Sequence, residues 1–311
     1  GDSYLDGSPE DRRKELEQGV NLKDIFNPLG FGKKDYDLIS NVNYLPGGFR
    51  NQLDIYRPKN APAEGAPVLM LIHGGAWKLG QKGQQAVALT RLMTRHGWVV
   101  VDINYRLSPE VFMPAHTQDC KAALCWIREN GSEYGMNTDF VAVMGGSAGG
   151  QLSSILGVSA NEPALQPGKE HVDTSVQAAV PFYGPHDMAS ESNRVPNAHV
   201  ARHWLTGVVL EKSLEQDPSV WRMVSPLSHV NEDAPPYMVV HGGSDSVVAI
   251  EHSRVFVEAL GKKSKNPVVY TELPGADHAF DFVNSIRTRH TVNGVHRFLE
   301  WAKAKHEAKA K

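Results

Sequence analysis

The stretch FVAVMGGSAGGQL at residues 140–152 decides the fold of this chain. Its first five residues are an apolar run typical of a buried strand, and the motif GGSAG (145–149) then opens a helical segment. Small residues on both sides of Ser147 leave room for a sharp turn that raises its hydroxyl above the sheet edge. The turn also places Ser147 at a helix N-terminus, where the helix dipole favours developing negative charge. The pattern makes Ser147 a candidate nucleophile, with an ordinary helix cap as the alternative.

Short apolar runs and helical stretches alternate on both sides of this motif. Continuous apolar runs are typical of strands covered on both faces, and strand–helix alternation predicts a mostly parallel sheet with helices on both faces. The sequence therefore predicts the α/β class. The expected strands are 67–72, 98–103, 140–144, 178–183, 237–240 and 268–273, and the expected helices are 83–96, 114–130, 148–160, 248–260 and 289–304.

Three segments depart from this alternation. Residues 37–45 and 51–58 alternate apolar and polar side chains around Pro46-Gly47-Gly48, which predicts two antiparallel strands and a turn. Residues 1–36 are charged and interrupted by glycine, so we expect an N-terminal extension or possible lid, with one helix at Pro9–Gln18. About 50 residues, 185–234, separate two strands, and such a long interval predicts a cap insertion. We therefore expect one catalytic domain over 37–311.

A serine nucleophile needs a base and an orienting carboxylate farther along the chain. His278, in LPGADHAF, follows the last expected strand, and Asp245, in VVHGGSDSVV, follows the preceding one. All three residues then lie at the carboxyl ends of parallel strands, where sites in open α/β sheets assemble. We predict a catalytic triad in the chain order Ser147, Asp245, His278.

Other histidines and acids compete for these roles. His73 and His241 directly follow strands and precede glycines, so we expect them to order loops through backbone hydrogen bonds. Asp277 adjoins His278 and is badly placed to reach its ring, which leaves Asp187 as the serious rival acid. We expect a surface role for the histidines of the insertion, namely His186, His199, His203 and His229.

Acyl transfer creates an oxyanion that needs preorganised N–H donors. The segment HGGAW (73–77) directly follows the strand at 67–72, where an oxyanion loop belongs. We predict the N–H groups of Gly75, Ala76 and Ala148 as donors, with Gly74 allowing close approach of the backbone. Candidates for the substrate-pocket wall are Trp77, Tyr183, Trp204, Trp221 and Phe280, each with core packing as the alternative.

Composition excludes several classes of partner. The chain has 311 residues, 32 Lys and Arg against 35 Asp and Glu, and a formal charge of −3, so nucleic-acid binding is not expected. It has no apolar run of 18 residues that could span a membrane.

Cys120 and Cys125 lie five apart on an expected helix and point to different faces, so we expect two reduced thiols and no metal site. Reduced thiols are compatible with the cytoplasm, but the chain starts at Gly1 and not Met, which suggests a processed or recombinant start and leaves localisation open.

Three motifs together carry a resemblance to a known family. They are HGGAW (73–77), VDINYRLSPEVFMPAHTQDCKAAL (101–124) and GGSAGG (145–150). Over about residues 37–304 the chain resembles the hormone-sensitive-lipase-like branch of the α/β-hydrolases, which are esterases acting on small acyl esters. Two departures, HGGAW without a third glycine and the acid in HGGSDSVV (241–248), are similar instead to kynurenine formamidases and to small esterases resembling feruloyl esterases.

These observations predict a serine carboxylesterase that hydrolyses small acyl esters through an acyl-enzyme and needs no cofactor. One alternative is an amidase of the arylformamidase type with the same triad. Another, from a different class, is a non-catalytic binding protein on a hydrolase fold. The sequence leaves open the acyl length, the alcohol preference and the oligomeric state.

Overall fold

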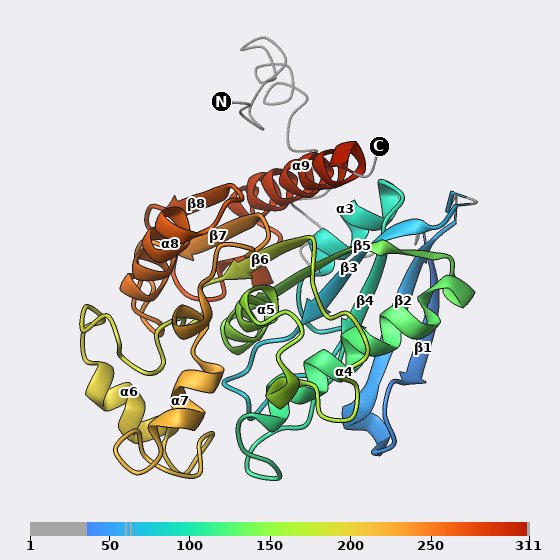
Figure 1. Ribbon diagram of the computed structural model, residues 1–311. Coiled ribbons are helices and arrows are strands. Elements are labelled where there is room, and N and C mark those ends of the chain that lie inside the picture. The colour runs from blue at the N-terminus through green and yellow to red at the C-terminus, as the bar shows by residue number, and fades with distance from the viewer. Residues whose placement is uncertain (1–35, 60, 63, 310–311) are drawn as a thin grey trace.

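The computed structural model describes residues 36–309 except 60 and 63 (Figure 1). The expected helix at Pro9–Gln18 and the possible lid within residues 1–36 therefore lie outside the described residues, Tyr36 apart. The described chain builds one eight-stranded sheet with the order β1-β2-β4-β3-β5-β6-β7-β8. The strands are β1 (Tyr36–Asn43), β2 (Gln52–Pro58), β3 (Ala66–Ile72), β4 (Val99–Ile103), β5 (Met136–Gly146), β6 (Ala178–Phe182), β7 (Tyr237–Gly242) and β8 (Val268–Leu273).

The sheet is antiparallel at its beginning and parallel elsewhere. Strand β1 pairs antiparallel with β2, and β2 pairs antiparallel with β4. The pairs from β4 through β3, β5, β6 and β7 to β8 are all parallel. This confirms the predicted α/β class and its antiparallel start. Because the parallel strands point the same way, the loops that follow β3, β5, β6, β7 and β8 meet at one edge of the sheet.

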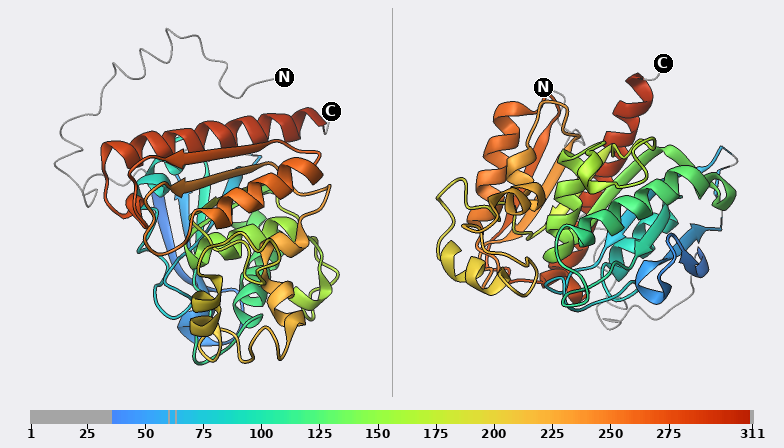
Figure 2. Two further views of the ribbon diagram at one scale, coloured as in Figure 1. Left: turned by 90° about the vertical axis from the view of Figure 1, so that its left-hand side faces the viewer. Right: turned by 60° about the horizontal axis from the view of Figure 1, so that its bottom comes forward.

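Helices cover both faces of the sheet, and each face has its own apolar core. Helices α4 (Ala115–Asn130), α5 (Ala148–Val158) and α8 (Glu251–Lys263) pack on one face around residues such as Leu152 and Phe256. Helices α3 (Val87–Arg95) and α9 (Ile286–Lys309) pack on the other around Met93 and Phe298. Figure 2, left, shows α9 and α8 on opposite sides of β7 and β8. No helix in residues 36–309 is long and apolar enough to cross a membrane.

The interval predicted as a cap holds two short helices. These are α6 (Ala198–Leu205) and α7 (Pro218–Val224), which are drawn in yellow and gold at the lower left of Figure 1. The insertion is anchored to the α5 face of the sheet, because Leu205 and Trp221 join the apolar core there. The Gln151 side chain on α5 also donates a hydrogen bond to the Val224 carbonyl at 2.7 Å.

Short 3₁₀ turns complete the described chain. They are η1 (Gly48–Asn51), η2 (Gly131–Tyr134), η3 (Pro163–Leu165), η4 (Pro226–His229) and η5 (Phe280–Phe282). Cys120 and Cys125 are both buried and free, in agreement with the prediction from their spacing.

Two helices begin later than their sequence patterns predict. Helix α3 begins only at Val87, because Gly83 and Ala86 have left-handed backbone conformations, with φ of +80° and +54°, that a right-handed helix does not include. Helix α8 begins at Glu251, after the loop in which the N–H groups of Val247 and Val248 donate to Asp245.

Candidate active site

Ser147 occupies a tight turn between β5 and α5. Its φ of 57° lies in the left-handed region, which is uncommon for any residue other than glycine. The Ser147 N–H donates to the Phe182 carbonyl at 3.0 Å, which ties the turn to the end of β6. Helix α5 can approach β3 only because position 149 carries no side chain: a Cβ on Gly149 would lie 2.1 Å from the Ile72 carbonyl oxygen.

We therefore expect Gly149→Ala to lower the free energy of unfolding by about 1–3 kcal/mol, the usual cost of overpacking. The matched control is Gly261→Ala on α8, because a Cβ there would meet no atom within 4 Å. Removing that helical glycine should instead stabilise the protein by about 0.5–1 kcal/mol. Chemical denaturation measures the free energy of unfolding of both variants. Equal changes in Gly149→Ala and Gly261→Ala would contradict the close approach of α5 to β3.

Three side chains from three loops form a continuous hydrogen-bonded row. The Nε2 atom of His278 lies 2.9 Å from Ser147 Oγ, and its Nδ1 atom lies 2.8 Å from Asp245 Oδ2. A carboxylate only accepts, so Nδ1 carries the proton and Nε2 is left to accept the serine proton. The structure thus brings together the residues that the sequence predicts as a triad.

The Asp245 carboxylate is buried and well satisfied. Burial alone would raise its pKa, but hydrogen bonds from His241, His278 and the N–H groups of Val248 and Val247 hold the pKa of Asp245 well below its ordinary value. Asp245 is therefore ionised at neutral pH and can stabilise a positive charge on His278.

His241 contacts the same carboxylate oxygen, Asp245 Oδ2, as His278 does. Its Nε2 atom lies 3.0 Å from the Val248 carbonyl and 3.2 Å from Asp245 Oδ2, while its Nδ1 faces the Ser253 hydroxyl at 2.7 Å. Because a carbonyl can only accept, Nε2 carries the proton and Ser253 donates to Nδ1. His241 therefore orders its loop, as the sequence predicts, and also holds Asp245, which the sequence analysis missed. The only sequence signal for this contact was the spacing of four residues between His241 and Asp245 within HGGSD.

The rival groups have other partners. Asp187 accepts from the N–H groups of Glu191 and Ser192 and from the Ser192 hydroxyl, and Asp277 accepts from Ser246. His73 is buried, and its Nδ1 lies 2.8 Å from the Gly74 carbonyl, consistent with the expected role in its loop. Burial lowers the pKa of His73 to about 4.

The expectation of a surface role is wrong for His186. Its side chain is fully buried and stacks on Phe256 with the ring centroids 4.6 Å apart. Burial holds the pKa of His186 well below its ordinary value. The segment that carries it follows β6 directly and packs under α8 before the insertion reaches the surface, whereas His199 and His203 on α6 are exposed.

The predicted oxyanion loop lies beside the nucleophile. A Cβ on Gly74 would lie 2.6 Å from the Gly146 carbonyl oxygen, so glycine permits this close approach. The Gly74 N–H donates to Gln85 Oε1 at 2.7 Å. Within the described residues, the N–H groups of Gly75, Ala76 and Ala148 donate to no backbone or side-chain acceptor. They therefore have free capacity for a ligand oxygen.

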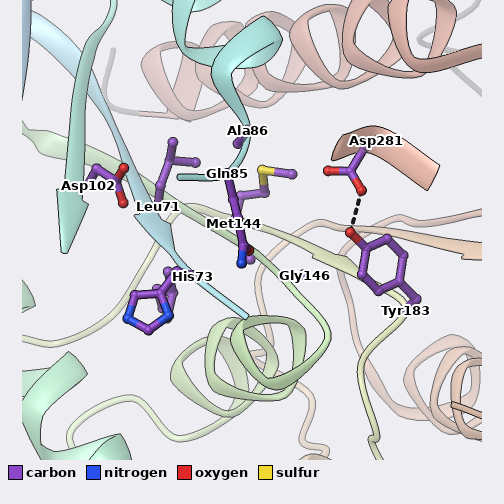
Figure 3. A pocket seen from close by; sticks show the side chains of 11 residues that line it. Leu71, His73, Gln85, Ala86, Asp102, Met144, Gly146, Tyr183 and Asp281 are labelled. Carbon is purple, nitrogen blue, oxygen red and sulfur yellow. Dashed lines mark hydrogen bonds between the residues drawn. The ribbon is translucent and has the colours of Figure 1, made fainter. Parts of the chain in front are cut away.

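A small pocket adjoins the turn on the α3 side (Figure 3). Tyr183 and Asp281 lie at one side of it and His73 and Asp102 at the other, with Gln85 between them. The complete lining is Leu71, Ile72, His73, Gln85, Ala86, Asp102, Met144, Gly145, Gly146, Tyr183 and Asp281. The sequence analysis missed Gln85, which lies in the loop before α3, and Asp281, which lies in η5, because neither stretch carries a recognisable motif.

The residues predicted to form the pocket wall lie in different environments. Tyr183 lines this pocket, and Phe280 packs against Tyr183 with the ring centroids 5.8 Å apart. Trp77 does not line it; its side chain is buried and donates to Gln151 Oε1 at 3.1 Å. Trp221 is buried in the core, and Trp204 is 45% exposed on α6.

Comparison with known proteins identifies the family. The family model described as BD-FAE matches residues 53–260, which is more than half of the chain and includes Ser147 and Asp245. The chain belongs to the BD-FAE family. This BD-FAE chain has the α/β-hydrolase fold, as its motifs predict: it superimposes on a truncated carbohydrate esterase from gut microbiota with a TM-score of 0.74 and 26% identity, covering 88% of this chain and 99% of that one.

Two curated relatives of this BD-FAE chain come from Mycobacterium tuberculosis. Esterase LipQ is 42% identical over 84% of this chain and 61% of its own length. The probable carboxylic ester hydrolase LipM is 43% identical over 86% of this chain and 62% of its own length. The chain thus spans about three fifths of the length of the curated relatives that it matches.

Proposed function

We propose that this protein is a serine carboxylesterase that hydrolyses small acyl esters. The observation that carries the proposal is the hydrogen-bonded row of Ser147, His278 and Asp245 next to three N–H groups that have no acceptor among the described residues. Relatives named esterase and carboxylic ester hydrolase support ester hydrolysis as the reaction.

In the proposed mechanism, His278 Nε2 takes the proton from Ser147 Oγ as this oxygen attacks the ester carbonyl. Asp245 keeps the proton on Nδ1 and stabilises the imidazolium that forms. The N–H groups of Gly75, Ala76 and Ala148 receive the negative charge that develops on the carbonyl oxygen. His278 then protonates the leaving alcohol, and water hydrolyses the acyl-enzyme by the same route. No step requires a metal or an organic cofactor.

The left-handed turn at Ser147 supports this assignment. A side chain held at positive φ is strained, and such strain is retained where function needs the geometry. The side chain of an ordinary N-cap serine accepts a hydrogen bond from the first turn of its helix, whereas Ser147 makes no side-chain cap hydrogen bond to α5. The turn instead points the hydroxyl at His278.

The proposal predicts hydrolysis of p-nitrophenyl acetate and labelling of Ser147 by a fluorophosphonate probe, located by peptide mass mapping. We expect faster turnover of the acetate ester than of N-formylkynurenine in parallel assays. The reverse order would favour the arylformamidase alternative. Absence of labelling together with absence of turnover would favour a non-catalytic binding protein. A series of p-nitrophenyl esters from acetate to decanoate then defines the acyl length.

We also propose that residues 37–311 act as one catalytic domain and that the segment 185–234 is a cap. Two observations support this: the described strands form a single sheet, and α7 is joined to α5 through the hydrogen bond from Gln151 to Val224. Small esters are the proposed partners, and neither nucleic acid nor a membrane is needed.

A further inference from the structure

Tyr183 and Asp281 form a hydrogen-bonded pair beside the triad without belonging to it. The Tyr183 hydroxyl donates a hydrogen bond to the Asp281 carboxylate. The phenol is the donor because its pKa is raised well above its ordinary value, first by burial and then by the neighbouring carboxylate of Asp281. The two residues are 98 positions apart in the sequence and meet beside the pocket in Figure 3.

Tyr183 packs directly against the imidazole of the triad. Its ring centroid lies 4.7 Å from that of His278, with the rings tilted by 59°. Its side chain is 1% exposed, so it has little freedom to move away. The same phenol also touches the nucleophile turn, because a Cβ on Gly146 would lie 2.8 Å from the Tyr183 oxygen. One side chain therefore contacts both the base and the residue before the nucleophile.

The backbone holds Tyr183 rigidly in this place. Its φ is +36°, unusual for a bulky side chain, and its N–H donates to the Val240 carbonyl at 2.8 Å. Strain of this kind persists only where the surroundings impose it, and it clusters at functional sites. The strained residue here lies in contact with His278.

Asp281 brings a second carboxylate to the neighbourhood of the imidazole. It lies in η5, three residues after His278, and Thr288 fixes this turn by donating to the Phe280 carbonyl at 3.2 Å. Burial raises the pKa of Asp281, and the Tyr183 hydrogen bond and the charge interaction with His278 partly offset this rise. The titratable groups around the imidazole are therefore Asp245 on the β7–α8 loop, Tyr183 after β6, and Asp277 and Asp281 on its own loop.

We propose that Asp281 is a positioning residue for His278, acting through Tyr183. It anchors the phenol that packs against the imidazole, and its charge adds to that of Asp245 in favouring the imidazolium that forms when Ser147 attacks. The inference rests on the proposed function, because it concerns the same base. It goes beyond the triad by assigning a role to an acid that does not touch His278 Nδ1.

The test compares Asp281→Asn with the control Asp233→Asn, which removes one exposed carboxylate from the loop before β7. We expect Asp281→Asn to lower kcat about five- to twentyfold, with KM for p-nitrophenyl acetate changed less than twofold, because the contact acts on the base and not on substrate binding. The acid limb of kcat/KM should move to lower pH, since a negative charge near the imidazolium is lost. Asp233→Asn should match the wild type in all three quantities.

A second variant separates the hydroxyl from the ring. Tyr183→Phe keeps the ring against His278 but removes the donor to Asp281, so we expect a fall in kcat while the acid limb stays where it is in the wild type or moves slightly to higher pH. Titration of the His278 ring by NMR in the wild type and in Asp281→Asn gives a readout that needs neither turnover nor a chosen substrate. The midpoint should be lower in the variant.

An imidazole that titrates at the same pH in Asp281→Asn and in the wild type, in a variant of unchanged thermal stability, would overturn the inference. Fluorophosphonate labelling of the wild type reports separately on the proposed function. If the wild type labels at Ser147 and the titration is unchanged, only the role of Asp281 fails. If the wild type neither labels nor turns over ester, both proposals fail.

Discussion

Ser147→Ala is expected to reduce kcat by about 10⁴- to 10⁶-fold, because no other group in the row can form the acyl-enzyme. The Ser147 hydroxyl oxygen lies 2.9 Å from His278 Nε2. Steady-state hydrolysis of p-nitrophenyl acetate with active-site titration measures the loss. The matched control is Ser153→Ala on the same helix, since the Ser153 hydroxyl donates to the Gly150 carbonyl. It should retain activity within about twofold.

His278→Ala should cost about as much as Ser147→Ala, and the double variant should cost no more than either single one. Residues that act as a unit lose their joint contribution when one of them is removed. Additive losses would mean that the two side chains act independently, in conflict with the hydrogen bond between them. Retention of more than a tenth of the activity by Ser147→Ala would exclude Ser147 as the nucleophile.

Asp245→Asn is expected to lower kcat about 10³- to 10⁴-fold at neutral pH. The N–H groups of Val247 and Val248 hold one carboxylate oxygen, at 2.9 and 2.8 Å, so the amide oxygen must occupy that position and the amide nitrogen must face His278. An NH₂ group there can only donate, so it forces the imidazole into the tautomer with the proton on Nε2. That nitrogen then cannot accept the serine proton.

The matched control for this prediction is Asp187→Asn, since Asp187 was the rival acid. Its carboxylate accepts hydrogen bonds from the segment 191–192. We expect a change in kcat of less than about tenfold, with the larger effect on thermal stability. NMR of the imidazole nitrogens shows whether the tautomer changes in Asp245→Asn. A greater loss of kcat in Asp187→Asn than in Asp245→Asn would reverse the assignment of the acid.

Patterns within single segments predict most of the sheet. The runs at 67–72, 98–103 and 178–183 become β3, β4 and β6 within about one residue at each end. They are recognisable because a strand buried on both faces must be apolar along its whole length. The residues at the carboxyl ends of such strands were then also predictable as neighbours, because parallel strands end at one edge. Because of this geometric rule, the sequence alone groups Ser147, Asp245 and His278 at one site.

Contacts between loops were much harder to predict. His186 lies in a stretch that reads as the start of a surface insertion, yet it is buried against Phe256. Gly83 lies outside α3, at a φ of +80°, and its N–H donates to Asp102 of the neighbouring strand β4. In both cases the deciding partner comes from a distant part of the chain, and a local pattern contains no information about it.

The sequence by itself determined the order of strands and helices and the three residues that meet at the sheet edge. Hydrophobic periodicity and small residues around a turn act over a few positions and can be identified from neighbouring residues alone. Only the tertiary structure decided the environment of those three residues: His241 against Asp245, Tyr183 against His278, and Asp281 bound to Tyr183. These contacts depend on how separate loops pack against one another at the edge of the sheet, and no local pattern in the sequence encodes that packing.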